Sequence, residues 1–176
     1  MEIKTGKYSL EDRNLNFEVI NEFQFKNRND CYYLRGGNGF GKTSFLEKII
    51  IPALETSNID YLYIGQDIRT QLYTLRALLS ILGHKVFNAD EYDILKLWIE
   101  NSQSAKFFIL DEFDKYYSDY GFIFDWSNQF IETYIIVTHL SDNQMETRIA
   151  NYQVCNVRFE QINFDGRVKN IRVRKE

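Results

Sequence analysis

The sequence predicts one α/β domain in which helices cover a mainly parallel β-sheet and antiparallel strands flank it. Two observations lead to this prediction. Short, fully apolar segments, typical of strands buried on both faces, alternate along the chain with segments of helical periodicity. The first thirty residues instead alternate apolar and polar side chains, which is typical of antiparallel strands. With 44% apolar and 26% charged residues, the 176-residue chain can bury a sizeable core, and disorder is excluded.

The N-terminal part predicts strands that lead into a cluster of glycines. The alternating apolar residues of the antiparallel strands are Leu15, Phe17, Val19, Phe23 and Phe25. Residues 27–30 favour a turn, and the apolar segment 31–34 predicts a strand that runs directly into the glycines. A helix is expected over 43–51. We expect it to end or kink at Pro52, because proline removes a helical hydrogen bond.

The rest of the chain continues the alternation of strands and helices and closes with a hairpin. Apolar strands are expected at 59–64, 107–110 and 134–137, and helices at 70–82 and 92–100. The segment 154–173 predicts a hairpin that turns at Asp165-Gly166, since this dipeptide suits the tight turns between strands.

The glycine cluster carries the first functional motif. Four of the nine glycines lie between positions 36 and 41, and the segment Gly36-Gly-Asn-Gly-Phe-Gly-Lys-Thr43 fits the pattern G-x-x-x-x-G-K-[ST]. In a phosphate-binding loop of this kind, glycines let successive N–H groups converge on phosphate oxygens, and the following helix adds partial positive charge. We expect Lys42 to reach the β- and γ-phosphates and the Thr43 hydroxyl to ligate Mg²⁺.

A second motif combines a buried strand with two carboxylates. The segment Phe107-Phe-Ile-Leu ends in Asp111 and Glu112, which places both at the carboxyl edge of a parallel sheet, where the phosphate loop also emerges. We expect Asp111 to hold Mg²⁺ through water and Glu112 to act as the base for an attacking water. Asp114 could be mistaken for that base, but it lies past the expected end of the strand.

Two single polar residues follow other buried strands. Gln66 comes just after the strand 59–64, and His139 comes just after the strand 134–137. Either alone could be an ordinary loop residue. In the order phosphate loop, Gln66, Asp111-Glu112 and His139, they predict side chains gathered at one edge of the sheet.

Together these segments resemble the nucleotide-binding subunits of ABC (ATP-binding cassette) ATPases. In that resemblance Gln66 stands at the Q-loop, Asp111-Glu112 end the Walker B strand, and His139 in Val-Thr-His-Leu is the switch histidine. The segment Phe164-Asp-Gly-Arg-Val also resembles the closing hairpin of the family. The resemblance covers most of the chain.

The resemblance implies ATP and Mg²⁺ as ligands and a defined set of site residues. The nucleotide would be bound by Gly36, Gly37, Asn38, Gly39, Phe40, Gly41, Lys42, Thr43 and Ser44. The metal ligands would be Thr43, Gln66 and Asp111, and the catalytic residues Glu112, His139 and Gln66. The family further implies a head-to-tail homo- or heterodimer, in which each site joins one subunit's Walker motifs to the other's LSGGQ signature.

The sequence departs from the family at the signature. The usual interval before Asp111 places it at 87–91, Phe-Asn-Ala-Asp-Glu, which lacks both signature glycines and has Asn88 in place of the serine. Asn88 could instead cap the next helix. A carboxylate from Asp90 about 4 Å from a γ-phosphate would be repelled by about 4 kcal/mol at an effective dielectric of about 20. The helical arm is also short, and Tyr8 and Phe17 are only weak candidates for stacking on adenine.

The resemblance favours an ATP-hydrolysing subunit that powers a partner, first of all the nucleotide-binding component of an ABC transporter with a separate membrane permease. The alternatives are a soluble ABC-type ATPase acting as a conformational switch, and a pseudo-enzyme that binds ATP without turnover. Glu112 and His139, which are both retained, argue against the pseudo-enzyme. The expected partner is a permease or a second ATPase subunit, and the expected location is cytoplasmic or at the inner membrane face through that partner.

Composition limits the other classes of function. The net charge of −4 argues against direct binding of nucleic acid. No secretory signal is evident, and no apolar run approaches the roughly 18 residues of a membrane span, so the chain is expected to have no transmembrane segment of its own. Cys31 and Cys155 have no metal-ligand spacing around them and are expected to be free thiols in a reducing compartment.

The expected domain covers residues 1–176 and has four parts: antiparallel strands (1–30), the phosphate-binding core (31–66), a reduced helical arm (67–91), and a last part with Walker B, the switch strand and the closing hairpin (92–176). The hairpin ends in a basic segment with Arg167, Lys169, Arg172, Arg174 and Lys175. Protection of an exposed edge strand explains such a segment, and contact with a lipid or a partner is the alternative.

Overall fold

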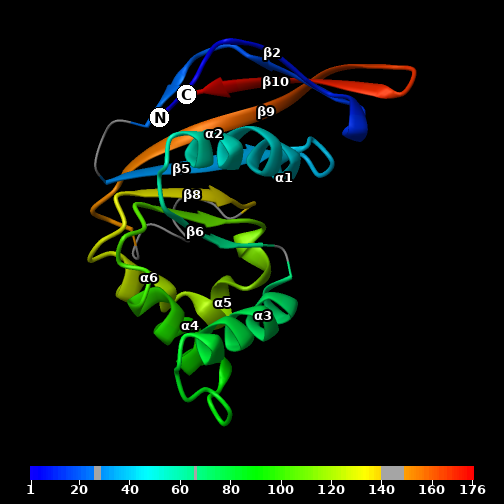
Figure 1. The fold of residues 1–176 in the computed structure, drawn as a ribbon. Helices are drawn as coiled ribbons and strands as arrows, with labels where there is room; N and C mark the ends of the chain where they lie inside the picture. The colour runs from blue at the N-terminus through cyan, green and yellow to red at the C-terminus, as the bar shows by residue number, and fades with distance from the viewer. Residues whose placement is uncertain (26–28, 66, 140–148) are drawn as a thin grey trace.

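The computed structural model describes residues 1–25, 29–65, 67–139 and 149–176 (Figure 1). Its strands are β1 (Glu2–Ile3), β2 (Gly6–Leu10), β3 (Leu15–Val19), β4 (Phe23–Gln24), β5 (Asp30–Gly36), β6 (Tyr61–Ile64), β7 (Phe107–Leu110), β8 (Thr133–Val137), β9 (Gln153–Asp165) and β10 (Val168–Lys175). Its helices are α1 (Lys42–Phe45), η2 (Leu46–Ile50), α2 (Ile51–Thr56), α3 (Ile68–Ile81), α4 (Glu91–Glu100), α5 (Tyr117–Tyr120) and α6 (Ile123–Ser127), with single turns η1 (Glu11–Arg13) and η3 (Phe113–Lys115).

The main sheet has eight strands in the order β2-β3-β10-β9-β5-β8-β7-β6, and β1 pairs separately with β4. Strands β5, β8, β7 and β6 are parallel, as the apolar segments predicted. Strand β9, predicted only as part of the closing hairpin, also pairs in parallel with β5. The antiparallel pairs β2–β3 and β9–β10 extend this same sheet at one edge, where β3 and β10 are parallel to each other. The α/β prediction is therefore confirmed, and the antiparallel strands continue the central sheet.

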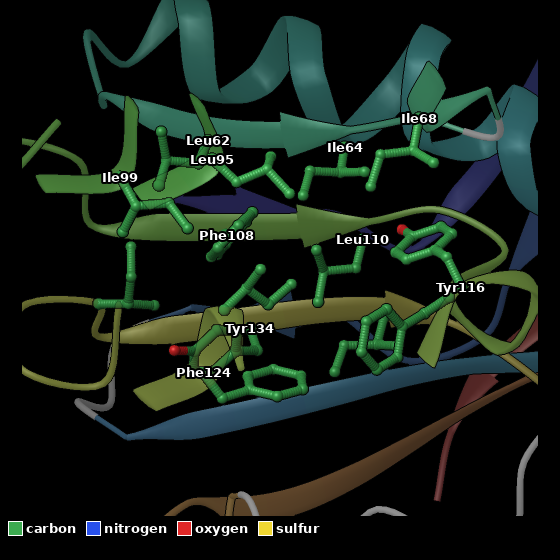
Figure 2. Close-up of a cluster of buried hydrophobic side chains, with 14 of the residues drawn as sticks. Leu62, Ile64, Ile68, Leu95, Ile99, Phe108, Leu110, Tyr116, Phe124 and Tyr134 are labelled. Atoms are coloured by element: carbon green, nitrogen blue, oxygen red, sulfur yellow. The ribbon is translucent and has the colours of Figure 1, made fainter. Parts of the chain in front are cut away.

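Helices cover both faces of the sheet. Successive residues of β5 point to opposite sides: Cys31 and Tyr33 join one buried cluster, while Tyr32 and Leu34 join the other. The first cluster lies under α3, α4 and α6 and is drawn in Figure 2, where Phe108 and Tyr134 occupy its centre. The second lies under the helical segment that begins with α1, seen on the other side of β5 in Figure 1. Burial on both faces explains why these strands are apolar throughout.

The helix after the glycine cluster is longer than predicted. It continues from α1 through η2 and α2 to Thr56, so Pro52 does not end it. The segment before Pro52, Leu46–Ile50, is a π-helix, whose wider turn accommodates a residue that has no N–H and needs room at the preceding carbonyls. The prediction of an end at Pro52 is corrected on this point: the proline is accommodated by a local change of helix type.

The predicted helical arm packs on the core and is not a separate unit. Helix α3 buries Ile68, Leu72, Leu75 and Leu79 in the first cluster. Asp67 caps this helix, since its carboxylate accepts a hydrogen bond from the Thr70 N–H at 3.1 Å. Only the connection between α3 and α4 extends away from the sheet (Figure 1).

The closing hairpin is as predicted, with its turn at Asp165-Gly166. Gly166 has φ +62°, a left-handed conformation that glycine adopts without strain. Strand β9 pairs with β5 as far as Gly36, which lies opposite Phe159, and then continues to Asp165. The hairpin therefore extends past the end of β5 and over the loop before α1 (Figure 1).

The two cysteines are buried free thiols on adjacent strands. Cys155 lies opposite Tyr32 in the β5–β9 register and shares its face, while Cys31, one residue earlier, belongs to the other face. A disulfide between them would require one side chain to pass through the sheet, which explains why the thiols stay separate.

Candidate active site

The site begins with the loop between β5 and α1. A Cβ added to Gly36 would lie 2.6 Å from the Phe159 carbonyl oxygen on β9, so only glycine fits where the strand enters the loop. Gly41 has φ +74°, and a Cβ there would lie 2.9 Å from both Leu15 and Phe17. These two glycines let the loop turn tightly against β3 and β9. A loop of this shape, followed by the N-terminus of α1, suits an anion.

Lys42 occupies the centre of this loop. Its Nζ donates hydrogen bonds to the Gly36 carbonyl at 2.8 Å and to the Gly37 carbonyl at 3.0 Å, so the ammonium group lies inside the curve of the loop. Burial lowers the pKa of Lys42, and the carboxylates of Glu112, Asp111 and Asp114 oppose this effect. The loop carbonyls thus hold the Lys42 side chain at the point where a phosphate would enter.

Thr43 and Asp111 meet across the sheet edge. The Thr43 Oγ1 donates to Asp111 Oδ1 at 3.2 Å, although 68 positions separate the two residues in sequence. Asp111 follows β7, is fully buried, and its N–H donates to the Ile64 carbonyl on β6 at 2.9 Å. A hydroxyl and a carboxylate in contact beside a phosphate loop fit Mg²⁺, which prefers oxygen ligands and takes few from the protein when it binds with phosphates.

Glu112 projects from an unusual backbone position into the same cleft. Its φ of +49° and ψ of +42° are left-handed, a conformation that costs a non-glycine residue about 1 kcal/mol and is often found at functional sites. The carboxylate forms an ion pair with Lys115, one turn further on, and this pairing raises the pKa of Lys115.

The segment behind these carboxylates is fixed by aromatic packing. The Tyr116 hydroxyl donates to the Asp111 carbonyl at 3.1 Å, and its ring packs edge-on against Phe113. Both rings are buried in the first cluster, beside Phe124 and Leu110, and Tyr116 lies at one end of the group in Figure 2. Burial raises the pKa of Tyr116, so its hydroxyl stays protonated as a donor. This packing restricts the backbone that presents Asp111 and Glu112.

His139 is the last predicted residue that the structure brings to the site. It follows β8, lines the cleft, and its backbone N–H donates to Asp114 Oδ1 at 3.3 Å. Asp114, in the turn η3 beyond the strand end, thus links the segments after β7 and β8. Gln66, predicted as a catalytic residue and metal ligand, lies outside the described residues.

These residues surround one cleft of about 800 Å³ at the carboxyl edge of the sheet. The predicted residues that line it are Asn38, Gly39, Gly41, Lys42, Thr43, Ser44, Glu112 and His139. Among the residues described, no three His, Cys, Asp or Glu side chains gather into a metal cluster. A divalent ion here would have to share its coordination with a ligand such as a phosphate.

The sequence reasoning missed one wall of the cleft. Arg13, Asn14, Phe164, Arg167 and Lys169 line it from η1 and from the β9–β10 hairpin. Lys169 Nζ donates to the Gly39 carbonyl at 3.2 Å, so the hairpin contacts the phosphate loop directly. The two weak candidates for adenine stacking lie elsewhere: Phe17 is buried in the core, and Tyr8 lines a separate hollow on the β2–β3 surface. The basic residues near the end of the chain, which include Arg167 and Lys169, were the feature of the sequence that could have indicated this wall of the cleft.

The segment 87–91 does not line the cleft of its own chain in the part of the structure described. Asp90, and not Asn88, caps α4: its carboxylate accepts from the Asp93 N–H at 2.8 Å. The Arg76 guanidinium on α3 donates to the carbonyls of Val86 at 2.6 Å and Ala89 at 2.8 Å. Local hydrogen bonds therefore account for the shape of this connection.

The strand–loop–helix unit after β5, the apolar strand β7 followed by Asp111 and Glu112, and the parallel sheet that contains both strands are the features of the P-loop NTPase fold. The search of protein-family models returned no match for the sequence, and neither did the search of curated proteins. Among solved structures, the chain is similar to a KaiC-like protein, PH0186, from the hyperthermophilic archaeon Pyrococcus horikoshii OT3. The two share 18% identity over 78% of this chain and 76% of the other, with a TM-score of 0.47.

Proposed function

We propose that this protein binds ATP with Mg²⁺ and hydrolyses it. The observation that carries the proposal is the contact of Thr43 Oγ1 with Asp111 Oδ1 at 3.2 Å, beside the buried ammonium group of Lys42. A general anion site would need the loop and the lysine alone. The Asp111 carboxylate and the Thr43 hydroxyl, in addition, suit a triphosphate that carries a metal ion. The positive charge of the metal would offset the repulsion between the phosphates and the Asp111 carboxylate.

Each of the proposed site residues would have a separate role in ATP hydrolysis. Lys42 would exchange its two loop carbonyls for β- and γ-phosphate oxygens. Thr43 and Asp111 would hold Mg²⁺, which would supply positive charge beside the phosphates. Glu112 orients the attacking water and accepts its proton. The water oxygen bonds to the γ-phosphorus as the bond to the β-phosphate oxygen breaks, which yields ADP and phosphate. His139, across the cleft, contacts the γ-phosphate.

Two substitutions test this proposal together. Lys42→Ala removes the cation and should abolish measurable MgATP binding by calorimetry, with an unchanged circular dichroism spectrum. Glu112→Gln keeps the shape of the side chain and should retain binding, while the hydrolysis rate falls by roughly 10²-fold or more. Equal MgATP affinity in wild type and Lys42→Ala would contradict the site. Hydrolysis by Glu112→Gln at the wild-type rate would contradict the role of Glu112.

The finer proposal is an ABC-type ATPase that powers a partner, with transport as the first candidate and a non-transport conformational switch as the alternative. The order of motifs and the retained Glu112 and His139 support it. None of the described helices is long and apolar enough to cross a bilayer.

A missing signature leads to a prediction about the partner. We expect the chain alone to hydrolyse ATP slowly and to remain monomeric with ATP, because two Asp90 carboxylates would oppose closure of a head-to-tail homodimer. An ATPase chain with an intact signature, or a permease that enforces closure, should raise turnover. Sedimentation and turnover with and without the partner measure this, with Asp90→Gly as the matched variant. Fast hydrolysis by the chain alone, unchanged in Asp90→Gly, would contradict the repulsion.

A further inference from the structure

The two sides of the phosphate loop differ in the strands that surround it. Asp111, Glu112 and His139 follow β7 and β8, which lie on one side of β5 in the sheet. The strands β9, β10 and β3 lie on its other side. If the reacting end of a nucleotide faces the carboxylates, as the proposed function requires, the part of the cleft lined by β3, β9 and β10 is left for its other end.

Three side chains form a row across these strands and face the loop. Leu15 on β3 lies opposite Lys169 on β10, and Lys169 lies opposite Phe164 on β9, so all three point to the same side of the sheet. Leu15 approaches Gly41, and Lys169 Nζ donates to the Gly39 carbonyl at 3.2 Å. Phe164, the third member of the row, therefore faces the cleft from the overhanging hairpin, which Figure 1 shows beyond the end of β5.

The Phe164 ring is 56% exposed, although a large apolar side chain normally gains by burial. It lines the same cleft as Lys42 and Thr43. Arg13 lines the cleft from η1 and forms an ion pair with Glu47 of η2 at 3.5 Å, so its guanidinium lies beside the helical segment that follows the loop. An aromatic ring and an arginine beyond a phosphate loop suit a flat, aromatic group, since rings and guanidinium planes both stack on nucleobases.

We propose that the β9–β10 hairpin is the base-binding element of this protein, and that the nucleobase of the bound triphosphate stacks on Phe164. The proposal rests on the proposed function and deepens it. Lys169 fastens the hairpin to the phosphate loop, and the Lys169 N–H donates to the Asn14 carbonyl at 3.0 Å, which ties η1 to the same strand. Base and phosphates are thus bound by elements that contact each other.

The test compares a ligand that has a base with one that has none. Calorimetry with Mg²⁺ measures the affinity of wild type and Phe164→Ala for ATP and for inorganic tripolyphosphate. Stacking losses on alanine substitution predict that Phe164→Ala weakens ATP roughly tenfold to 100-fold. The affinity for tripolyphosphate should stay within about twofold, because the phosphate contacts remain. Phe164→Tyr should restore ATP affinity.

Ile162→Ala is the matched control, because Ile162 is an exposed apolar residue of the same strand that lines a different hollow. It should leave both affinities unchanged. Equal weakening of ATP and tripolyphosphate by Phe164→Ala, or no weakening of ATP, would overturn the stacking. If wild type binds neither ligand, the proposed function fails and the base site with it. Wild type that binds tripolyphosphate as tightly as ATP would overturn the base site alone.

Discussion

At the residue scale, the site depends on a few positions where only one residue type fits. Gly36 is the clearest, because β9 passes so close that a Cβ would lie 2.6 Å from a backbone oxygen that cannot move without breaking the sheet. Glu112 shows the opposite case, a residue that keeps its carboxylate although its left-handed backbone would suit glycine better. Space sets the residue type at Gly36, whereas the proposed role of its carboxylate would account for the residue type at Glu112.

We expect Gly36→Ala to destabilise the protein by at least about 2 kcal/mol, since overpacking against backbone adds to conformational strain. Gly83→Ala is the matched control. Gly83 has φ +89°, but a Cβ there would meet nothing within 4 Å, so only the strain of about 1 kcal/mol applies. Urea unfolding followed by circular dichroism measures both. Equal losses for the two variants would contradict the steric argument.

At the element scale, the sequence predicted the parallel strands β5, β6, β7 and β8 but not the parallel pairing of β9, and it misjudged where some elements end. Apolar strands such as β7 and β8 are recognisable because both of their faces are buried. The continuation of the helix through Pro52 could not be predicted, since nothing local in the sequence shows that a π-helical turn will accommodate a proline. The wall formed by Phe164 and Lys169 was missed for a related reason: it depends on how far β9 continues past β5, which is a matter of register.

The connection between α3 and α4 provides a prediction at this scale. Arg76→Met keeps the aliphatic stem but removes the donors to the carbonyls of Val86 and Ala89. Hydrogen bonds from charged groups contribute about 1.5–3 kcal/mol, less where solvent reaches them, so we expect a loss of roughly 1 kcal/mol. Hydrogen exchange of the amides in 83–89 should become faster.

Arg69→Met, an exposed arginine on the same helix, is the control and should change neither the stability nor the exchange. Unchanged exchange in Arg76→Met would mean that the connection keeps its shape without the guanidinium. The site itself should be unaffected by either variant, because neither arginine lines the cleft described.

At the scale of the whole molecule, the eight-stranded sheet has a buried cluster on each of its two faces and the candidate site at one edge. The strands that bring Asp111, His139 and the phosphate loop together are held from both faces, so the site is built on the most buried part of the chain. The wall with Arg13 and Phe164 comes from the antiparallel edge, which is the part of the sheet with more exposed side chains. The residues of the proposed chemistry and those of the proposed base site thus lie in regions of different local packing.

The pair of thiols tests this picture, because burial raises the pKa of both Cys31 and Cys155. At about pH 8 the native protein should react with a thiol reagent far more slowly than the unfolded chain, where an ordinary thiol has a pKa of about 8.5. Absorbance with Ellman's reagent, with and without urea, measures the two rates. Fast labelling of both thiols without denaturant would contradict their burial.

The placement of these thiols on opposite faces gives the chain a built-in pair of reporters. Cys31 belongs to the buried cluster on the face that α3, α4 and α6 cover, and Cys155 belongs to the cluster on the face that α1 and α2 cover. Mass spectrometry of briefly labelled protein can therefore tell which layer separates first from the sheet. Since α1 begins at the phosphate loop and α3 does not, a nucleotide should slow labelling at Cys155 more than at Cys31. The labelling rate of each thiol thus measures how strongly the ligand stabilises the helices on that face of the sheet.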